Sequence, residues 1–485
     1  MLALPAILAG AALLRAVAGV GFANYDTLYA LAWGGQLARG STPAYETAIA
    51  PTPHPLVELV GLVLSPLSPR AIEDVAVALG FIALAACGWV IYALAERWFG
   101  RAAGVLAAAI FLTRVPVLSY GVRAYIDIPY LLLVLWALLL IARDAHKPVA
   151  PLALLAAAGL LRPEAWVFSG LYLFYVLDWM PTWARRLLAR AGASRAPARP
   201  RRSRTEVVPL VLLAASAPLV WLATDLTITG DVLWSLKHTR HTAHELGRVT
   251  GIANVPQYIP RRVGEILRPP VLAGGVLGLG LSLWWLRGRA LVPAAAGLLA
   301  VVVFAVFATL GLPINSRYAF LTAAIGCVFA GAGVFGWSVL PSEDRRRRPW
   351  IAAGAIVLIA LIAYTPASIK SAHRELTKLA RQEGIQDDLI ALVKGHAISL
   401  RCGPVGVPNH APVPLLALYM EASPRDIANL AVQQQRTGVY VDPASKDVET
   451  AYVLDPRDPI VSVSVPPGFG EVAANRSWII FERCA

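Results

Sequence analysis

GFANYDTLYALAWGGQLARGSTPAYETAIAPTPHP (residues 21–55) follows the first apolar run of the chain and carries two acids, a histidine and several aromatic residues. The ionisable residues are Asp26, Glu46 and His54. A carboxylate so close to the end of a membrane span is unfavourable unless it is solvated or paired, so it marks a candidate functional site. The alternative interpretation is an ordinary interfacial loop in which Asp26 caps a helix.

The composition is that of a membrane protein. Of the 485 residues, 57% are hydrophobic and only 15% are charged, whereas soluble domains carry about 25% charged residues. Apolar runs of roughly 15 to 22 residues recur along the chain, and about 20 residues are needed to cross the hydrocarbon core. The first run, residues 2–20, has its one early basic residue inside the run and no signal-type cleavage site, so we expect a retained span.

Basic loops indicate the orientation in the membrane. The net charge is +13, with eight arginines between Arg185 and Arg204 and four more at 345–348. Such loops usually lie on the cytoplasmic side and also suit anionic headgroups, so nucleic-acid binding is a poor explanation of them. We therefore expect a cytoplasmic N-terminus, with the 21–69 loop and the tail from Thr365 outside the cytoplasm.

The apolar runs predict a mainly α, polytopic helix bundle of about eleven spans. The segment 149–177 is ambiguous, because a single long span would place the arginine-rich loop outside, against the positive-inside rule. Two short spans broken at Pro163 keep that loop inside, so we favour a hairpin. The expected spans lie near residues 2–20, 74–95, 102–118, 126–142, two within 149–177, 207–223, 271–286, 291–310, 319–340 and 350–364.

The tail predicts a small α/β domain, residues 365–485, after a membrane domain of residues 1–364. Residues 371–396 have apolar positions three and four apart, as in a helix. Short strand-like pieces follow, separated by turn-rich segments. These pieces are ISLRCGPVGV, TGVYVDP, AYVLD, IVSVSV and WIIFERC.

We expect a disulfide bond between Cys402 and Cys484. Both lie in the tail that the topology places outside, where disulfides persist. Cys87 and Cys327 lie in expected spans and cannot easily reach them. Two unpaired thiols are the alternative.

The topology also brings polar residues to one face of the membrane. Acids beside arginine, tyrosine and histidine suit a reaction in which an anionic group leaves a sugar, since a carboxylate can take the acceptor's proton and cations can hold the phosphate. The alternative is internal pairing, such as Arg162 with Glu164 or Asp127. The candidates are Asp26, Glu46, His54, Arg123, Tyr125, Asp127, Arg162, Glu164, the 237–248 stretch with His238 and His241, Arg317 and Tyr318.

Several short motifs resemble the GT-C superfamily of multi-span glycosyltransferases that use polyprenyl-phosphate sugars. They are ANYDTLYALAWGGQLARG, PTPHPL, YIDIP, LLRPEAW and INSRYAF, all in the membrane portion. The resemblance implies that Asp26 is the base or lies beside the reacting centre, that Asp127 supports it or positions the acceptor, and that Arg317 holds the donor phosphate. The tail's CGPVGVPNHAPVP and NRSWIIFERC resemble extracytoplasmic domains of bacterial, particularly actinobacterial, members. A WWDYG-like motif is missing, which speaks against an oligosaccharide donor.

We therefore expect an inverting membrane glycosyltransferase that moves a hexose or pentose from a polyprenyl-phosphate donor to a lipid, glycan or protein acceptor. A lipid or glycan transporter or flippase is the main alternative, but it predicts inverted repeats and polar groups near the midplane. A non-catalytic membrane scaffold is a third. The histidines at 238, 241 and 244 fit a metal site, a phosphate or acceptor contact, or a plain interfacial helix. The cysteines show no zinc spacing, so we expect no cofactor and do not favour a divalent metal.

Overall fold

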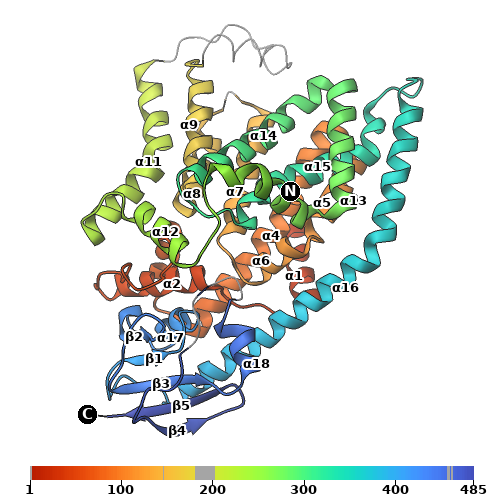
Figure 1. Cartoon of the computed structure of the whole chain (residues 1–485). Coiled ribbons are helices and arrows are strands. Elements are labelled where there is room, and N and C mark those ends of the chain that lie inside the picture. Colours follow the sequence, from red (N-terminus) through yellow and green to blue (C-terminus); the bar gives the residue numbers. More distant parts are fainter. Residues whose placement is uncertain (1–2, 146, 181–202, 456–458, 460–462, 485) are drawn as a thin grey trace.

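The computed structural model describes residues 3–145, 147–180, 203–455, 459 and 463–484. A bundle of helices occupies one part of the molecule and a small sheet domain lies below it in Figure 1. The bundle consists of α1 (Ala3–Ala18), α2 (Tyr25–Ala38), α3 (Pro55–Leu64), α4 (Pro69–Phe99), α5 (Arg101–Leu112), α6 (Val115–Val122), α7 (Asp127–Arg143), α8 (Val149–Leu161), α9 (Glu164–Val176), α11 (Arg204–Thr229), α12 (Trp234–Glu245), α13 (Val255–Trp285), α14 (Arg287–Thr309), α15 (Phe320–Phe335) and α16 (Arg347–Lys394), with the short 3₁₀ turns η1 (Ile252–Asn254), η2 (Ser316–Ala319) and η3 (Gly336–Val339).

The number of membrane spans differs from the expected eleven. Within the described residues, six helices are long and apolar enough to cross a membrane, namely α4, α11, α13, α14, α15 and α16, with short 3₁₀ turns extending two of them. The pair α5 and α6, bent by 64°, would make a seventh. A helix lies at every expected position, but α1, α7, α8 and α9 have 16, 17, 13 and 13 residues. Eleven full spans are therefore not confirmed.

The hairpin expected within residues 149–177 is present. Arg162 leaves the helical conformation at the end of α8, with ψ of 133°, and Pro163 precedes α9. The Tyr172 hydroxyl donates to the carbonyl of Ala145, 3.2 Å away, so α9 returns to the level at which α8 began. The basic linker that follows, residues 185–204, lies almost wholly outside the described residues.

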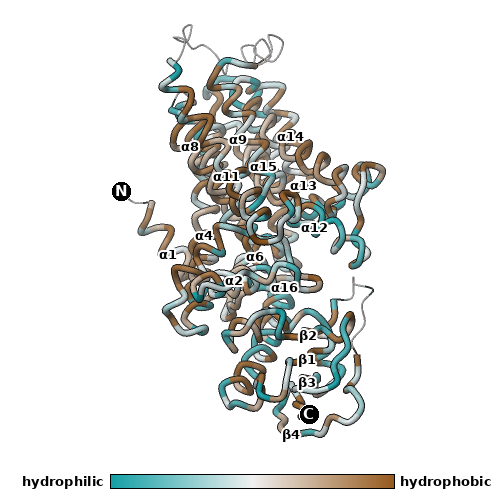
Figure 2. The backbone as a smooth tube through the Cα atoms, turned by 90° about the vertical axis from the view of Figure 1, so that its left-hand side faces the viewer, coloured by the Kyte–Doolittle hydropathy of each residue, from teal (hydrophilic) through white to brown (hydrophobic). Residues whose placement is uncertain are grey.

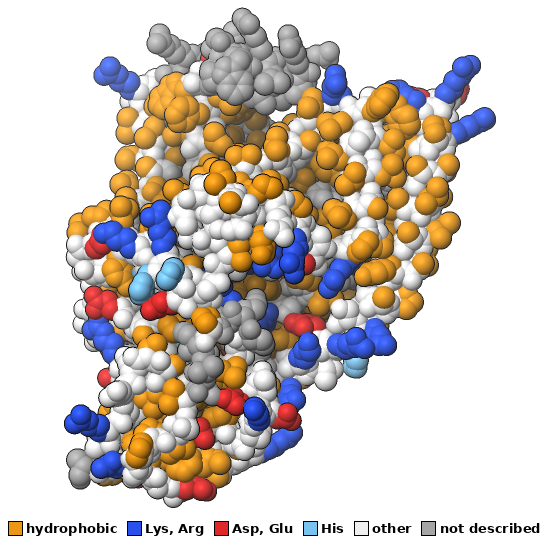
Figure 3. Space-filling view, viewed as in Figure 1, with side chains coloured by type: hydrophobic (Ala, Val, Ile, Leu, Met, Phe, Trp, Pro, Cys, Tyr) orange, Lys and Arg blue, Asp and Glu red, His pale blue; other side chains and the backbone are white. Residues whose placement is uncertain are grey.

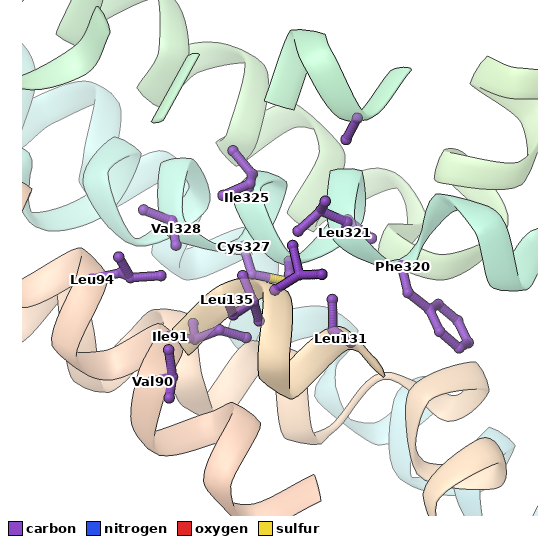
Figure 4. Packing of buried hydrophobic residues seen from close by; sticks show 14 of the residues in the cluster. Val90, Ile91, Leu94, Leu131, Leu135, Phe320, Leu321, Ile325, Cys327 and Val328 are labelled. Atoms are coloured by element: carbon purple, nitrogen blue, oxygen red, sulfur yellow. The ribbon is translucent and has the colours of Figure 1, made fainter. Parts of the chain in front are cut away.

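The core of the bundle forms where α4, α7 and α15 meet. Figure 4 shows side chains of the three helices pointing toward one another, with Ile91, Leu135 and Cys327 near the centre. Helices α13 and α15 approach more closely still, because a Cβ atom at Gly278 would overlap the carbonyl of Phe329. Small residues at such contacts are what allow helices to associate in lipid, where van der Waals packing is a main attraction between them.

A buried arginine compensates for two breaks in the helices. Helix α13 is interrupted at Arg268, which has φ of 64° and precedes two prolines. The break frees a backbone carbonyl, and the guanidinium of Arg114 donates to the carbonyl of Leu267 at 3.1 Å. The second break lies between α5 and α6, where the Nε of Arg114 donates to the backbone carbonyl of Ile110 at 3.0 Å. Such pairing is required in a membrane, because an unsatisfied backbone group there is unfavourable by several kcal/mol.

The two ends of the bundle differ in charge. Basic side chains project at the end opposite the sheet domain, and apolar side chains cover the band between (Figure 3). The turns of this basic end lie together, since Arg289 donates to the carbonyl of Trp98 and Ser338 donates to that of Phe99. Figure 2 shows the same arrangement: hydrophobic residues predominate along the bundle, and hydrophilic residues gather at its basic end.

The C-terminal part is a small α/β domain, as expected. Its mixed sheet has the order β2-β1-β3-β5-β4, in which β1 lies parallel to β2 and β3, and β5 lies antiparallel to β3 and β4. Its elements are β1 (Val405–Val407), α17 (Val413–Tyr419), η4 (Pro424–Asp426), β2 (Ile427–Asn429), β3 (Gly438–Pro443), α18 (Lys446–Val448), the π-helical η5 (Glu449–Val453), β4 (Gly470–Ala474) and β5 (Trp478–Arg483).

Three details of the tail differ from expectation. AYVLD was expected to be a strand, but most of it belongs to η5, packed against the sheet through Tyr452 and Trp478. Strands β2 and β4 were not expected, and half of IVSVSV lies outside the described residues. The expected boundary between residues 364 and 365 falls inside α16, a single helix that runs from the basic end into the tail.

The first loop and the C-terminal domain share one hydrophobic core. Buried aromatic residues of the loop, including Trp33 and Tyr45, belong to the same cluster as Leu416 of α17. The carboxylate of Glu73 in α4 joins them further, accepting from the backbone N–H of Ala23 at 2.9 Å and from the Tyr419 hydroxyl. The predicted disulfide bond between Cys402 and Cys484 is confirmed and links β5 to the segment before β1.

Candidate functional site

The site begins at the first turn of α2. The side chain of Asn24 caps this helix, accepting from the backbone N–H groups of Asp26 at 2.8 Å and Thr27 at 3.4 Å. Its amide donates to the carbonyls of Arg123 and Ala124, both at 3.2 Å. Asn24 thus fixes Asp26 against the turn that leads into α7.

A single guanidinium lies between the two expected catalytic acids. Arg317 Nη1 lies 2.5 Å from Asp26 Oδ2 and 3.9 Å from Asp127 Oδ2. Asp127 is the first residue of α7, and Arg317 lies in η2, just before α15. The two carboxylates are therefore in one cluster although they are about a hundred residues apart, as the topology predicted.

A second guanidinium completes the cluster. Arg162 Nη1 pairs with Asp127 Oδ1, and its Nη2 lies 2.7 Å from Glu164 Oε1. These three side chains are less than 10% exposed. The internal pairing of Arg162 with Glu164 and Asp127 is thus real, and it holds Asp127 beside Arg317.

The cluster borders a small cavity of about 20 Å³, roughly the room that one water molecule needs. Arg317 is paired with carboxylates but also lines this cavity, and its Nε is buried without a hydrogen-bond partner. The guanidinium of Arg162 lies over the Tyr318 ring, 4.3 Å from its centre. The lining residues are Asp127, Tyr130, Arg162, Glu164, Phe168, Ala300, Val303, Phe304, Phe307, Arg317, Tyr318, Phe320 and Leu321.

His54 joins the cluster from the start of α3. Its Nδ1 lies 2.7 Å from the carbonyl oxygen of Leu161, beside Arg162. Burial raises the pKa of Asp26, but the adjacent Arg317, together with His54 and Arg162, lowers the pKa by more than burial raises it. The pKa of Asp26 therefore lies below its usual value. Asp26 is therefore ionised at neutral pH.

Three other candidates lie outside the cluster. Glu46 is exposed and pairs with Arg425 of the C-terminal domain at 3.3 Å, so it joins the two parts of the protein instead of facing Asp26. Arg123 stacks on Tyr125, 4.8 Å from the ring centre, and donates to the carbonyl of Ser119. Arg123 and Tyr125 therefore contact each other, and the backbone of Arg123 borders the site through its hydrogen bond with Asn24.

The histidines of α12 do not converge on a metal site. His238 stacks on Trp234, and its Nε2 lies 2.9 Å from the carbonyl of Ala50. His241 is exposed and pairs with Glu245 at 3.2 Å. Within the described residues, the group close enough to hold a metal ion is Cys402, Glu482 and Cys484, whose sulfurs are already bonded to each other.

The sequence analysis missed several residues of the site. Tyr130 and Phe168 line the cavity, and each lies one helical turn after a candidate acid, so the i+3 and i+4 spacing from Asp127 and Glu164 was available to find them. The cap formed by Asn24 was also readable, since asparagine before a helix is a preferred N-cap. The apolar residues of α14 carry no such pattern.

The sequence matches no protein-family model and no curated protein. Among solved structures, ArnT from Cupriavidus metallidurans bound to undecaprenyl phosphate matches with a TM-score of 0.57 and 13% identity, covering 98% of this chain and 97% of that chain. This chain has the GT-C fold. ArnT in the apo state matches with a TM-score of 0.56 and 13% identity, over 98% and 96% of the two chains. Archaeal oligosaccharyltransferase AglB from Archaeoglobus fulgidus matches with a TM-score of 0.49 and 13% identity, over 87% and 64%.

The likeness to ArnT agrees with the expected helix bundle and its small C-terminal sheet, and at 13% identity it speaks to the fold alone. The roles of the site residues in this chain therefore rest on the geometry described above.

Proposed function

We propose that this GT-C protein is a membrane glycosyltransferase that moves one sugar from a polyprenyl-phosphate donor to an acceptor at the extracytoplasmic face. The observation that carries the proposal is Arg317, which contacts Asp26 and Asp127 and also borders a cavity. A base and a phosphate-binding cation must both lie at the reacting carbon in such a transfer. The match to ArnT, which was solved with undecaprenyl phosphate, supports a donor of this kind.

In this proposal Arg317 binds the donor phosphate and Asp26 acts as the base. A guanidinium offers a planar pair of donors to phosphate, and the unpartnered Nε of Arg317 is one of them. Arg262 donates to the carbonyl of Ile314, so a second cation supports the loop that carries Arg317. Asp127 is held by Arg162 and keeps Arg317 in place.

The orientation in the membrane is part of the proposal. The first loop, which carries Asp26, shares a core with the sheet domain, whereas basic side chains project at the opposite end of the bundle (Figure 3). By the positive-inside rule, the basic end is cytoplasmic and the C-terminal domain is extracytoplasmic. The N-terminus is then cytoplasmic.

The chemistry we propose uses the side chains of the cluster without a metal or organic cofactor. Each acid of the cluster accepts from or pairs with a guanidinium. The acceptor is a lipid, a glycan or a protein, and the sugar is a hexose or a pentose.

The test is transfer of label from a panel of undecaprenyl-phosphate [¹⁴C]sugars by membranes that contain the full-length protein. Asp26→Asn keeps the shape of the side chain and removes the proton acceptor, so turnover should fall by roughly 10² or more. Asp231→Asn is the control, because Asp231 forms an exposed ion pair with Lys237 away from the cluster. Transfer at the wild-type rate by Asp26→Asn would remove Asp26 from the mechanism, and no transfer by the wild type from any donor would contradict the proposed function.

A further inference from the structure

The run of four arginines at residues 345–348 takes no part in the cluster around Arg317. It lies between η3 and the first turn of α16, at the basic end of the bundle. Glu343 and Asp344 directly precede it, so the turn carries four positive charges against two negative ones. A concentration of arginine next to a membrane helix attracts anionic lipid headgroups.

The local acids neutralise one of these arginines. Arg346 Nη2 lies 2.6 Å from Asp344 Oδ2, and the backbone N–H of Arg346 donates to Asp344 Oδ1 at 2.9 Å. Within the residues that the structure describes, no carboxylate pairs with Arg345, Arg347 or Arg348, and the first and last of these are exposed. Three guanidinium groups of the turn are therefore left to bind an anion.

The guanidinium of Arg347 is held in a fixed orientation. Its carbon lies 5.0 Å from the centre of the Trp337 ring, and its Nε is covered without a hydrogen-bond partner. Trp337 is itself fixed, because its indole N–H donates to the carbonyl of Val334 at 3.0 Å. A guanidinium stacked on an aromatic ring loses little further freedom when it binds phosphate, and its planar shape suits that group.

Tryptophans indicate the depth of this turn in the membrane. Trp350, in the first turn of α16, contacts Trp285 near the end of α13, with ring centres 5.5 Å apart. The neighbouring Trp284 is 84% exposed. Tryptophan gathers at the boundary between hydrocarbon and headgroups. The arginines that directly precede Trp350 therefore lie at the level of lipid phosphates.

An exposed apolar face of α16 continues from Arg348. Ile351, Ile359 and Ile362 are 41%, 66% and 64% exposed, and at 3.6 residues per turn they lie within about 60° of Arg348 around the helix axis. The opposite face packs on the bundle, where Val357 would meet a Cβ atom placed on Gly274 of α13. One face of α16 thus presents a cation followed by apolar side chains.

We propose that an anionic phospholipid binds here, with its phosphate at Arg347 and Arg348 and its acyl chains along the exposed face of α16. The lipid belongs to the leaflet at the basic end of the bundle, which is the cytoplasmic leaflet in the proposed orientation. A phospholipid uses both features of this face. A free phosphate ion or an acidic peptide would leave the apolar side chains unused.

The test is native mass spectrometry of the full-length protein in detergent, with phosphatidylglycerol and with phosphatidylcholine of the same acyl chains. The wild type should bind phosphatidylglycerol more tightly. Arg348→Gln removes one charge and should weaken that binding about fivefold. Arg347→Lys keeps the charge but loses the planar group stacked on Trp337, so it should also weaken binding. Binding of phosphatidylcholine should be unchanged in both variants.

Arg101→Gln is the matched control, because Arg101 is exposed at the same end of the bundle and pairs with Glu96 at 3.1 Å. It removes the same charge and should leave the affinity for phosphatidylglycerol unchanged. Equal binding of the two lipids by the wild type would overturn the inference. So would a loss in Arg101→Gln as large as in Arg348→Gln, which would show diffuse attraction without a site, or displacement of phosphatidylglycerol by an equal concentration of inorganic phosphate, which would show a site for a free anion. The measurement uses no sugar donor, so its outcome is independent of the proposed function.

Discussion

Replacing Tyr419 with phenylalanine removes the hydrogen bond from its hydroxyl to Glu73, which joins the C-terminal domain to the membrane bundle. The Tyr419 hydroxyl donates to one carboxylate oxygen of Glu73, and the backbone N–H of Ala23 donates to the other at 2.9 Å. Glu73 is 3% exposed and Tyr419 is 9% exposed, so water cannot easily replace the lost donor. Ala23 directly precedes Asn24, the cap that fixes Asp26.

The size of the effect follows from this burial. Leaving a buried acceptor without its partner costs about 1–3 kcal/mol. When Ala23 opens and Glu73 becomes solvated, this penalty disappears, so the opening becomes more frequent by about 5- to 150-fold. We expect the amide of Ala23 to exchange hydrogen faster by that factor in Tyr419→Phe, measured by hydrogen–deuterium exchange on the full-length protein in detergent.

Tyr452→Phe is the matched control in the same core. The Tyr452 hydroxyl lies 3.5 Å from the carbonyl of Ala411, a long and weak hydrogen bond. Its removal should change exchange at Ala23 little. If Tyr419→Phe left the exchange of Ala23 unchanged, Glu73 would not couple the C-terminal domain to the site, and the argument would be wrong.

Two further predictions concern the site and the tail. Arg317→Lys keeps the charge but loses the planar guanidinium, whose Nη1 lies near Asp26 and Asp127 and whose Nε is left to bind phosphate, so turnover should fall by about 10-fold or more in the label-transfer assay; equal turnover would show that charge alone suffices. Cys484→Ser removes a crosslink between residues 82 apart, worth roughly 4 kcal/mol in the loop-closure model, so the variant should unfold at a lower temperature and be cleaved faster by protease near β5, and an unchanged melting temperature would contradict this.

The sequence was sufficient for features that depend on local pattern or on the membrane. Apolar runs and basic turns predicted a helix at every expected position and the reversal at Pro163, because a membrane requires continuous apolar segments and positive turns on one side. The same topology placed Asp26, Asp127 and Arg317 at one face. It also placed Cys402 and Cys484 in one compartment, where the structure shows them bonded.

The tertiary structure alone decided which of those residues meet. Glu46 and Arg317 are both charged and both predicted at the same face, yet Glu46 pairs with Arg425 of the tail and Arg317 pairs with Asp26. A pattern along the chain does not contain this choice, because it depends on how α15 and the C-terminal domain pack against α2. Helix lengths were also beyond the sequence, since short helices such as α8 and α9 are sustained by their neighbours in the bundle and not by their own apolar length. The place of His54 was decided in the same way, since its Nδ1 lies 2.7 Å from the carbonyl oxygen of Leu161, about a hundred positions away, which only the folded chain brings to the ring.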